Sequence, residues 1–537
     1  MRSLTPSCVV LALAASASAA DIHVPADHAT IQQALDASAP GDVVHVAPGT
    51  WREALVVPPH ALTLVGDEGA AVTLLDATGT GTSAVFCLPT DEPRVLRGFT
   101  ITGGSGAPGT WGWPAGGGVH GETSPATEVR ECVVTGNSAW SLQPLLGEGG
   151  GIYLSGSVFD CVIEGNQAVS GGGISSTGRI ERCLVRGNTA LIGGGIASSS
   201  AIVDSVVEDN VAWGQGGGLR LGSAAGLSGV VVRHNTAPDG GGLYVSSTEL
   251  TLRLTGCTFF ENVATGRGGG AWLHAMSSPL PKSIEVERCA FIGNAAGPGG
   301  GDLEVDGIQV QDVTLRHCTF VADAIVAPKA DFSSCVIRDV PAWMAGIAGP
   351  IAATWSDLPG GWPGAGNFDA DPFLAAAELG DVSLLPGSPC IDTGDPVDPP
   401  DADGTRADVG SEPFHPWADL GPGLGGAWGV PVLAGDGSLI GGSSTTLIVA
   451  GASPQAPALL VMGSFALLAP FKGGTLVPNA QELLGLFATD AAGGLVLQGA
   501  YPTGLPSGQE TLFQVWLPDG TSPQGWTATN GLKGTTR

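Results

Sequence analysis

Short runs of alternating apolar and polar residues recur seven times between residues 132 and 294, and each run ends in an Asn that precedes a Gly-Gly-Gly triplet. Five residues before each Asn stand Cys132, Cys161, Cys183, Ser205, Val230, Cys257 and Cys289. Two residues further along stand Val134, Ile163, Val185, Val207, Val232, Phe259 and Phe291. Residues two positions apart point to the same face of a β-strand, and the runs are too short for helices. Each run therefore predicts a strand with one buried face.

The runs and triplets repeat every 22 residues where they are closest and about every 33 where they are farthest apart. Such a period is typical of a solenoid, whose units cannot bury a core alone and must stack. A further ladder follows the triplets, at Val119, Ile152, Ile174, Ile196, Leu219, Leu243 and Ala271. We therefore predict a right-handed parallel β-helix in which equivalent residues of successive coils lie over one another, about 4.8 Å apart.

The repeated Asn residues form a column in this prediction, at Asn137, Asn166, Asn188, Asn210, Asn235, Asn262 and Asn294. Each side-chain amide can bond to the Asn of the next coil, and Asn tolerates the left-handed backbone region. The glycine triplets suit tight corners where a Cβ would clash. Exported proteins usually oxidise their cysteines to disulfides, but an inward column favours Cys as a small buried apolar residue. We expect mostly free, packed thiols.

Three segments resemble known families. The GGGI and GN-x-A alternation resembles the repeats of polymorphic outer-membrane proteins and other right-handed β-helix repeat proteins. Ile22–Glu53 resembles the N-terminal cap of the pectin-lyase-like superfamily, and Phe368–Pro396 resembles the closing coils of secreted bacterial β-helix proteins. The resemblance covers roughly residues 21–411 and implies the fold. It implies no single activity, because the superfamily includes lyases, hydrolases, esterases and proteins without catalysis.

The chain divides into four predicted segments. Residues 1–20 have an early Arg, an apolar stretch and small residues, as in a signal peptide. Residues 21–115 form a cap, with a helix at Thr30–Ala37 and a strand at Val43–Val46, and the first irregular coils. Residues 116–411 form the β-helix and its closing coils. Residues 412–537 alternate short apolar strands with Gly, Pro and Asp turns, which predicts an antiparallel β-sandwich.

Composition narrows the choice of partner and location. The 537 residues carry a formal net charge of −29. This charge argues against a nucleic-acid partner, because phosphate binding needs clustered Lys and Arg. No run after residue 20 is apolar enough to span a membrane. We expect a secreted or cell-surface protein.

The candidate ligand-binding residues lie one position after the ladder that follows the triplets. That outward column contains His120, Tyr153, Ser175, Ala197, Arg220, Tyr244, Trp272 and Leu303, and His274 lies two residues beyond Trp272. Aromatic rings along a flat sheet can stack on sugar rings, and Arg220 could pair with an acidic sugar. The predicted polysaccharide-binding set is His120, Tyr153, Arg220, Tyr244, Trp272 and His274. The competing interpretation is that aromatic residues simply favour strands.

Two other outward columns carry different chemistry. Glu164 and Glu208 alternate with Arg186 and Arg233, which predicts ion pairs between coils. One residue past the Cys column, a row of apolar residues should face outward as a patch, at Val133, Val162, Leu184, Val206 and Val231.

A calcium site is a weaker hypothesis. Carboxylates gather in one Pro-rich turn region, at Asp395, Asp398, Asp401, Asp403 and Asp408. Ca²⁺ prefers several oxygen ligands, although this spacing departs from the EF-hand loop and Asp-rich turns are usually solvated. The cysteines and histidines show no CxxC pair and no His pair at ligand spacing along the chain.

The sequence favours binding over catalysis. It contains no Asp-Asp pair, no Gly-His-Gly and no Arg-x-Lys of the kind used by hydrolases and lyases of this superfamily. We expect a protein that binds extracellular polysaccharide or acts as an adhesive or structural surface element. The alternative is a carbohydrate-active enzyme, most plausibly a polysaccharide lyase, with no cofactor beyond Ca²⁺.

Overall fold

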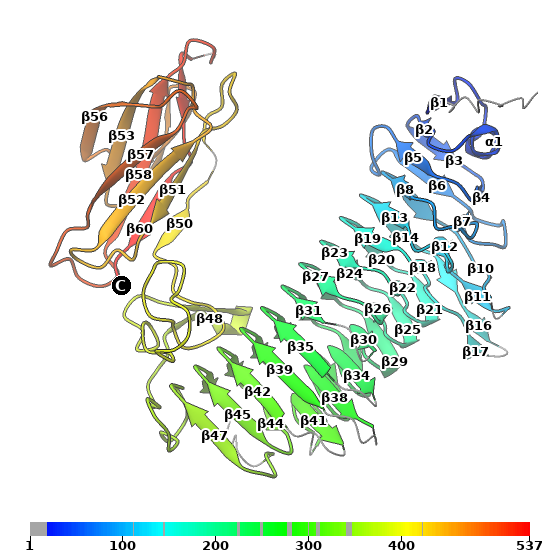
Figure 1. Cartoon of the computed structure of the whole chain (residues 1–537), viewed down its shortest axis with the longest axis horizontal. Helices are drawn as coiled ribbons and strands as arrows, with labels where there is room; N and C mark the ends of the chain where they lie inside the picture. Colours follow the sequence, from blue (N-terminus) through cyan, green and yellow to red (C-terminus); the bar gives the residue numbers. More distant parts are fainter. Residues whose placement is uncertain are drawn as a thin grey trace, which may run out of the picture. The chain divides into compact units, whose positions relative to one another are not determined.

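The computed structural model describes residues 19–537 except 111, 143–144, 223–225, 248–250, 277–281, 299, 308–311, 340–345, 422 and 523. The predicted signal peptide therefore lies almost wholly outside the described residues. The structure forms two compact units (Figure 1). The first contains Met1–Ile284, Asn294–Gln311 and Ala324–Val326, and the second contains Glu285–Gly293, Asp312–Asp323 and Ala327–Arg537.

The first unit begins with the predicted cap. Helix α1 (Ile31–Ala37) starts after Thr30, whose side chain accepts a hydrogen bond from the Gln33 N–H, and it buries Ile31, Ala34 and Leu35. The predicted strand forms as β2 (Val43–Val46), which pairs in parallel with β1 (Asp21–Val24). Both predictions are confirmed.

The rest of the first unit is a solenoid of parallel sheets, which we name A to D (Figure 1). Sheet A contains β1, β2, β5 (Leu62–Gly66), β8 (Arg94–Arg97), β13 (Thr127–Arg130), β19 (Ser157–Phe159), β23 (Ile180–Glu181), β27 (Ile202–Val203), β31 (Leu227–Ser228) and β35 (Thr251–Thr255). Sheet B contains β3 (Gly49–Trp51), β6 (Thr73–Asp76), β9 (Thr100–Thr102), β14 (Val133–Thr135), β20 (Val162–Glu164), β24 (Leu184–Arg186), β28 (Val206–Glu208), β32 (Val231–Arg233) and β36 (Thr258–Phe260).

Sheets C and D complete each coil. Sheet C contains β4 (Leu55–Val57), β7 (Val85–Cys87), β12 (Val119–Gly121), β18 (Ile152–Leu154), β22 (Ile174–Ser176), β26 (Ile196–Ser198), β30 (Leu219–Leu221), β34 (Leu243–Ser247), β38 (Ala271–Ala275), β41 (Leu303–Gly307) and β44 (Ile325–Val326). Sheet D contains β15 (Ser138–Ala139), β21 (Gln167–Ser170), β25 (Thr189–Ile192), β29 (Val211–Gln215), β33 (Thr236–Ala237) and β37 (Val263–Ala264). The solenoid also contains two short antiparallel hairpins. One pairs β10 (Ala107–Pro108) with β11 (Pro114–Ala115), and the other pairs β16 (Ser141–Leu142) with β17 (Leu145–Leu146).

Each regular coil turns at three residues with positive φ. One is the first glycine of the triplet, one precedes the Cys position and one precedes the Asn, as at Gly171 (φ 62°), Arg182 (φ 51°) and Gly187 (φ 60°). The left-handed residue is therefore the one before each Asn, not the Asn itself as the sequence suggested. The middle glycine is needed for room instead, because a Cβ on Gly194 would lie 2.3 Å from the Gly217 carbonyl oxygen.

The Asn column is buried and continuously hydrogen-bonded. Asn188 Oδ1 accepts bonds from the backbone N–H of Asn166 (2.9 Å) and from its Nδ2 (3.1 Å). Asn188 Nδ2 in turn donates to the Ile163 carbonyl and to Asn210 Oδ1, both at 3.0 Å. The same contacts recur from Asn137 to Asn294. The predicted amide ladder is confirmed, and it also satisfies backbone groups at a bend.

The Cys column works in a similar way. The Cys132 N–H points to Cys161 Sγ at 3.4 Å, and the Cys183 N–H donates to Ser205 Oγ at 3.1 Å. All nine cysteines in the described part of the chain are buried, and none of them forms a disulfide. The expectation of packed thiols is confirmed.

The outer surface of sheet B carries the predicted charge pairs. Arg186 Nη2 lies 2.7 Å from Glu164 Oε2, and Arg233 Nη2 lies 2.6 Å from Glu208 Oε2. The apolar row from Val133 to Val231 also points outward, but its side chains are half-buried. Neighbouring coils cover part of each side chain, so this row is less exposed than predicted.

The second unit contains two sets of parallel strands and the closing region. One set, β42 (Asp312–Arg316), β45 (Ala330–Ser333) and β47 (Ile351–Thr354), belongs to sheet A, and the other, β40 (Ala290–Ile292), β43 (Thr319–Val321) and β46 (Val336–Arg338), belongs to sheet B. Strand β39 (Ser283–Glu287) spans the boundary between the units. The chain then forms β48 (Leu374–Ala376), the 3₁₀ helix η1 (Ala377–Leu379) and β49 (Asp381–Leu384).

The C-terminal part of this unit has two antiparallel sheets packed face to face. One contains β50 (Trp417–Asp419), β60 (Leu532–Thr535), β58 (Glu510–Pro518), β53 (Pro457–Gly463), β56 (Glu482–Ala488) and β59 (Trp526–Ala528), and the other β51 (Val432–Asp436), β52 (Ser444–Ala450) and β57 (Leu495–Ala500). Strands β54 (Ala466–Phe471) and β55 (Gly474–Pro478) form a hairpin. Leu447 and Val449 share a core with Leu460, Phe513 and Val515. The predicted all-β class, a β-helix followed by an antiparallel sandwich, is confirmed.

We predict that Asn188→Ala destabilises the chain by about 2–4 kcal/mol, because it leaves two buried backbone groups of the preceding coil, the Asn166 N–H and the Ile163 carbonyl, without these partners. Urea unfolding followed by circular dichroism measures the change. The control is Gln167→Ala, an exposed residue directly after Asn166. Equal midpoints for the two variants would contradict a stabilising role for the Asn column.

Candidate binding face on sheet C

The predicted binding residues lie side by side on the outer face of sheet C. Parallel registry places His120 beside Tyr153, and Arg220 beside Tyr244 and then Trp272. Between these groups the column carries Ser175 and Ala197. Because the strands are in register, one outward residue of each coil lies next to that of the following coil.

One member of the predicted column is wrong. Leu303 pairs with Ala271 in the buried ladder, and Glu304 takes the outward position beside Trp272. The cause is one extra residue, Asp302, after the glycines of this coil. The alternation in Leu-Glu-Val-Asp, residues 303–306, could have revealed this registry, because Leu303 and Val305 are both buried.

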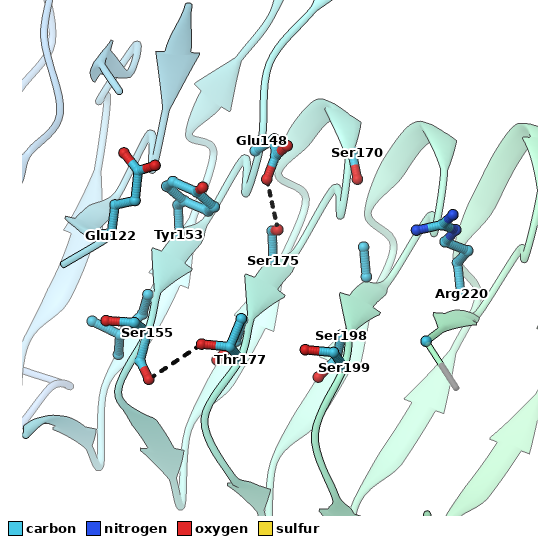
Figure 2. A pocket seen from close by; sticks show the side chains of 14 residues that line it. Glu122, Glu148, Tyr153, Ser155, Ser170, Ser175, Thr177, Ser198, Ser199 and Arg220 are labelled. Carbon is cyan, nitrogen blue, oxygen red and sulfur yellow. Dashed lines mark hydrogen bonds between the residues drawn. The ribbon is translucent and has the colours of Figure 1, made fainter. Parts of the chain in front are cut away.

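A shallow hollow of about 260 Å³ opens on this face (Figure 2). Small residues produce it: Ser175 and Ala197 stand where the neighbouring coils carry the large side chains of Tyr153 and Arg220. Hydroxyl groups line its floor and side, at Ser155, Ser170, Ser175, Ser176, Thr177, Ser198 and Ser199. The lining is therefore rich in groups that both donate and accept hydrogen bonds.

Arg220 forms one end of the hollow (Figure 2). Within the described part of the chain it has no acidic partner at ion-pair distance, and its side chain is partly exposed. Other solenoid arginines pair with acids of a nearby coil: Arg97 with Glu131, Arg182 with Asp160, Arg186 with Glu164 and Arg233 with Glu208. Arg220 is therefore available to an anionic ligand.

Glu122 and Tyr153 form the opposite end, and Glu148 lies along one side of the hollow, over Ser175 (Figure 2). Glu148 Oε2 accepts a hydrogen bond from Ser175 Oγ at 3.2 Å, and Glu122 Oε2 accepts one from the Thr110 N–H at 2.7 Å. Burial, together with these two carboxylates, raises the pKa of Tyr153 far above its ordinary value. Tyr153 is thus a neutral hydrogen-bonding phenol across the physiological range.

His120 lies beneath this acidic end and is buried. Its Nε2 is 3.8 Å from Glu122 Oε2, and its ring contacts the Tyr153 ring with centroids 5.6 Å apart. Burial lowers the pKa of His120, although Glu122 acts in the opposite direction. His120 therefore supports Tyr153 and Glu122 from below and is covered from solvent.

A second cluster lies farther along the same face. The Trp272 ring contacts Tyr244, with centroids 5.1 Å apart, and the Arg267 guanidinium lies 5.5 Å from the Trp272 ring centroid. Tyr244 is buried by these neighbours, whereas Trp272 is partly exposed. Aromatic contact with a ligand is therefore open to Trp272 and closed to Tyr244.

Two carboxylates of β41 join this second cluster. Asp306 lies 2.6 Å from His274 Nδ1 and 2.5 Å from Arg267 Nη1, and Arg267 Nε lies 3.6 Å from Glu304 Oε1. Glu304 is buried, and burial raises its pKa. An acid with a raised pKa thus lies beside a carboxylate that is held by the Arg267 guanidinium and the His274 imidazole.

Six residues of this face were predicted from the sequence, and several others were not. His120, Tyr153 and Arg220 border or support the hollow, and Tyr244, Trp272 and His274 belong to the second cluster. The missed residues are Glu122, Glu148, Arg267, Glu304 and Asp306. Glu148 and Arg267 come from corner segments, whose place over the sheet follows from the bends and not from strand alternation.

The five aspartates of the calcium hypothesis have separate protein partners. Asp398 Oδ2 lies 2.9 Å from His317 Nε2, Asp401 accepts a bond from the Asp408 N–H, and Asp403 pairs with Arg537. The Asp408 carboxylate accepts the N–H groups of Asp392 and Phe414, and Asp395 accepts that of Val397. Their carboxylates thus brace the closing turns, and the calcium site stays a prediction without geometric support among the described residues.

The sandwich contains a larger and chemically different cleft of about 660 Å³. It is lined mainly by apolar side chains, among them Leu460, Met462, Phe487, Val496 and Phe513. Among the described residues, no acidic or basic side chain lines it. No helix in the part of the chain that the structure describes is both long and apolar enough to cross a membrane.

Residues 117–291 match the family model described as the right handed beta helix region. With the stacked parallel sheets, this match establishes a right-handed parallel β-helix, as predicted. No curated protein matches the chain. A solved structure described as pectate lyase Pel9A is similar, with 13% identity, a TM-score of 0.36, and coverage of 74% of this chain and 97% of that chain. A likeness this distant carries no information about ligand or reaction.

Asp302, next to this face, should make the folding stability of the chain depend on pH. Burial raises its pKa from 3.8 to about 6, although its carboxylate accepts the Ala324 N–H at 2.8 Å. The folded state therefore binds this proton more tightly than the unfolded state, and stability falls as pH rises from about 4 to about 6. Asp302→Asn keeps an acceptor without the charge and should stabilise the chain at pH 7 by about 1–3 kcal/mol.

Urea unfolding of wild type and Asp302→Asn at pH 4 and pH 7 measures this difference, with the exposed Asp209→Asn as the control. Asp408 also has a pKa raised to about 6 by burial, so the quantity to compare is the gap between variant and wild type. A gap that is the same at both pH values would contradict the assignment to Asp302.

Proposed function

We propose that this chain is an exported protein whose sheet C face binds an acidic extracellular polysaccharide. The observation that carries the proposal is Arg220, a partly exposed guanidinium without an acidic partner among the described residues, at the edge of a hydroxyl-lined hollow. The acidic composition of the chain and the signal-peptide pattern of residues 1–20 support an extracellular location.

The chemistry of the hollow suits a sugar acid. Sugar hydroxyls both donate and accept hydrogen bonds, as do the Ser and Thr side chains that line the floor. A guanidinium pairs with a carboxylate through two parallel hydrogen bonds, which fixes the orientation of a uronic acid residue at Arg220. Glu122 at the other end and Glu148 along the side would accept hydrogen bonds from sugar hydroxyls.

The length of the hollow suits a polymer. Tyr153 and Arg220 are three coils apart, which corresponds to about 14 Å at the spacing of adjacent strands. The hollow is open and shallow, so a chain can continue beyond both ends. Trp272 lies two coils beyond Arg220 on the same face and offers a further aromatic contact.

We predict that the wild-type chain is retarded in native gels that contain a polyuronate and much less in gels that contain a neutral glucan. Arg220→Ala should weaken the polyuronate affinity by about tenfold, because a charge-assisted contact is lost. Tyr153→Ala should weaken it as well, while Arg186→Ala on sheet B is the matched control. Equal retardation of wild type and Arg220→Ala would contradict the proposed face.

A second candidate function is cleavage of such a polymer at the Glu304 and Asp306 cluster. The favouring observation is the pair of unlike carboxylates: Glu304 is buried with a raised pKa, and Asp306 is held by Arg267 and His274. Acid–base cleavage of glycosidic bonds uses two carboxyl groups whose different environments give them different pKa values.

If the chain cleaves a polyuronate, Glu304→Gln and Asp306→Asn should each lower the rate by about 100-fold or more. Reducing-end release detects hydrolysis, and ultraviolet absorption of unsaturated products detects elimination. Glu208→Gln, which alters an arginine-paired acid on sheet B, is the control. If the wild-type chain binds the polymer and releases neither product, the cleavage hypothesis is contradicted and the binding hypothesis is kept.

A further inference from the structure

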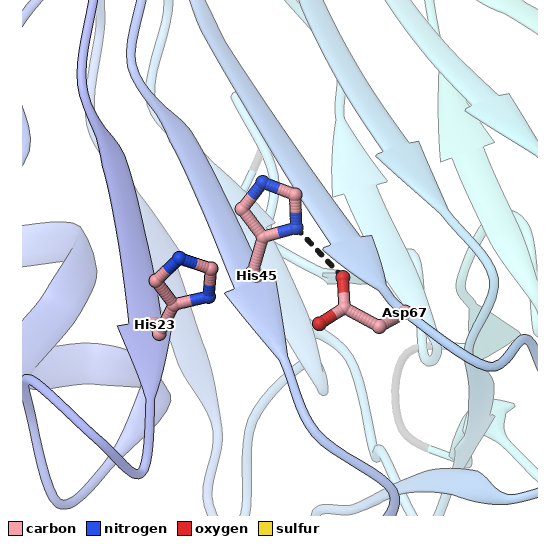
Figure 3. A group of neighbouring side chains, drawn as sticks. All are labelled: His23, His45 and Asp67. Carbon is pink, nitrogen blue, oxygen red and sulfur yellow. Dashed lines mark hydrogen bonds and ion pairs between the residues drawn. The ribbon is translucent and has the colours of Figure 1, made fainter.

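Two histidines and an aspartate lie together on the outer face of sheet A at the N-terminal end of the solenoid (Figure 3). His23, His45 and Asp67 are each 22 residues apart along the chain. Their nearest ligand atoms, one per side chain, all lie within 4.8 Å of one another. Among the residues that the structure describes, this is the one group of three or more His, Cys, Asp or Glu side chains with that property.

Strand registry brings the three residues together. His23 on β1 pairs directly with His45 on β2, and both point outward because Val24, Val44 and Val46 occupy the buried positions between. Asp67 follows β5 at once, and its N–H donates to the Val46 carbonyl at 3.0 Å. β1 is the edge strand of sheet A, so no further coil of the described residues covers His23.

The contacts among the three side chains are close. The two imidazole rings stack with centroids 4.9 Å apart and planes inclined by 23°. Asp67 Oδ1 lies 2.7 Å from His45 Nδ1, and Asp21 Oδ1 lies 3.4 Å from His45 Nε2. Two carboxylates therefore flank the pair of rings, so the local charge suits a divalent cation.

We propose that His23, His45 and Asp67 bind a divalent transition-metal ion, with Zn²⁺ as the best-suited ion and water in the remaining position. Two imidazole nitrogens and one carboxylate oxygen are donors that Zn²⁺, Co²⁺ and Ni²⁺ prefer, whereas Ca²⁺ and Mg²⁺ prefer oxygen donors alone. The ion would take the place of the proton that His45 and Asp67 share. Asp21 would accept a hydrogen bond from metal-bound water.

A simple ion pair explains less of this arrangement. His45 with Asp67 accounts for one contact, but it gives no reason for the His23 ring to stack on the His45 ring, with centroids 4.9 Å apart. Tetrahedral nitrogen ligands of one zinc ion stand about 3.3 Å apart, given Zn–N bonds of about 2.0–2.1 Å. The exposed His23 ring can close the remaining distance by rotating about its side-chain bonds, without any backbone shift.

Titration of the full chain without a polyhistidine tag tests the proposal. Isothermal titration calorimetry with Zn²⁺ measures affinity and stoichiometry, and the visible absorption of added Co²⁺ reports nitrogen and oxygen ligation. We expect one bound equivalent in the wild type. His23→Gln, His45→Gln and Asp67→Asn should each weaken Zn²⁺ binding by about tenfold or more.

The matched control is His234→Gln. His234 lies beside the carboxylates of Asp209 and Glu261, but only one imidazole among the described residues is present there, where the proposed site has two. The His234→Gln substitution should therefore leave Zn²⁺ binding unchanged. Thermal unfolding followed by circular dichroism checks that the outward substitutions leave the fold intact. The proposal is overturned if the wild type binds no Zn²⁺, or if all three variants bind it as tightly as the wild type.

Discussion

In-register stacking of parallel coils is the constraint on which the solenoid depends. Each coil has too little apolar surface to be stable alone, so its backbone and side-chain groups must find partners in the next coil. The Asn column shows this most directly, because every amide satisfies a buried backbone group at a bend and also bonds to the following Asn. The Cys and Ser column repeats the arrangement at a second bend. A residue that suits one coil therefore suits its neighbours, and like residues accumulate over one another.

The same registry shapes the outer surface. On sheet B the outward column alternates acids and arginines, which neutralise one another between coils. On sheet C the column changes size instead: Ser175 and Ala197 interrupt a row of large side chains, and the gap becomes the hollow. Arg220 at its edge differs from the arginines of sheet B because the adjacent coils present Ala197 and Tyr244, not acids. The proposed binding face thus lies where the outward residues of successive coils differ in size and charge.

Much of the fold could be predicted from the sequence, and less of the candidate site. Val134 and its equivalents, the Asn column and the cap helix were predicted from periodicity and capping alone. The error at Leu303 arose because one extra residue shifts a coil, which a fixed alignment on glycines cannot detect. Asn was assigned a left-handed backbone that belongs to the preceding residue, since both interpretations satisfy the same motif. Corner residues such as Glu148 and Arg267 follow no strand alternation and were missed.

The sequence by itself determined the repeat, the strand faces and the ladders, because these depend on residue type at a regular spacing. Tertiary structure decided which distant residues meet. His23, His45 and Asp67 look unrelated along the chain, and only the length of one coil turns their spacing into contact. It also decided exposure: Tyr153 and Tyr244 occupy equivalent positions, yet neighbouring side chains from other coils cover Tyr244 and leave Tyr153 at the edge of the hollow. Burial depends on the sizes of neighbours across coils, which local sequence does not contain.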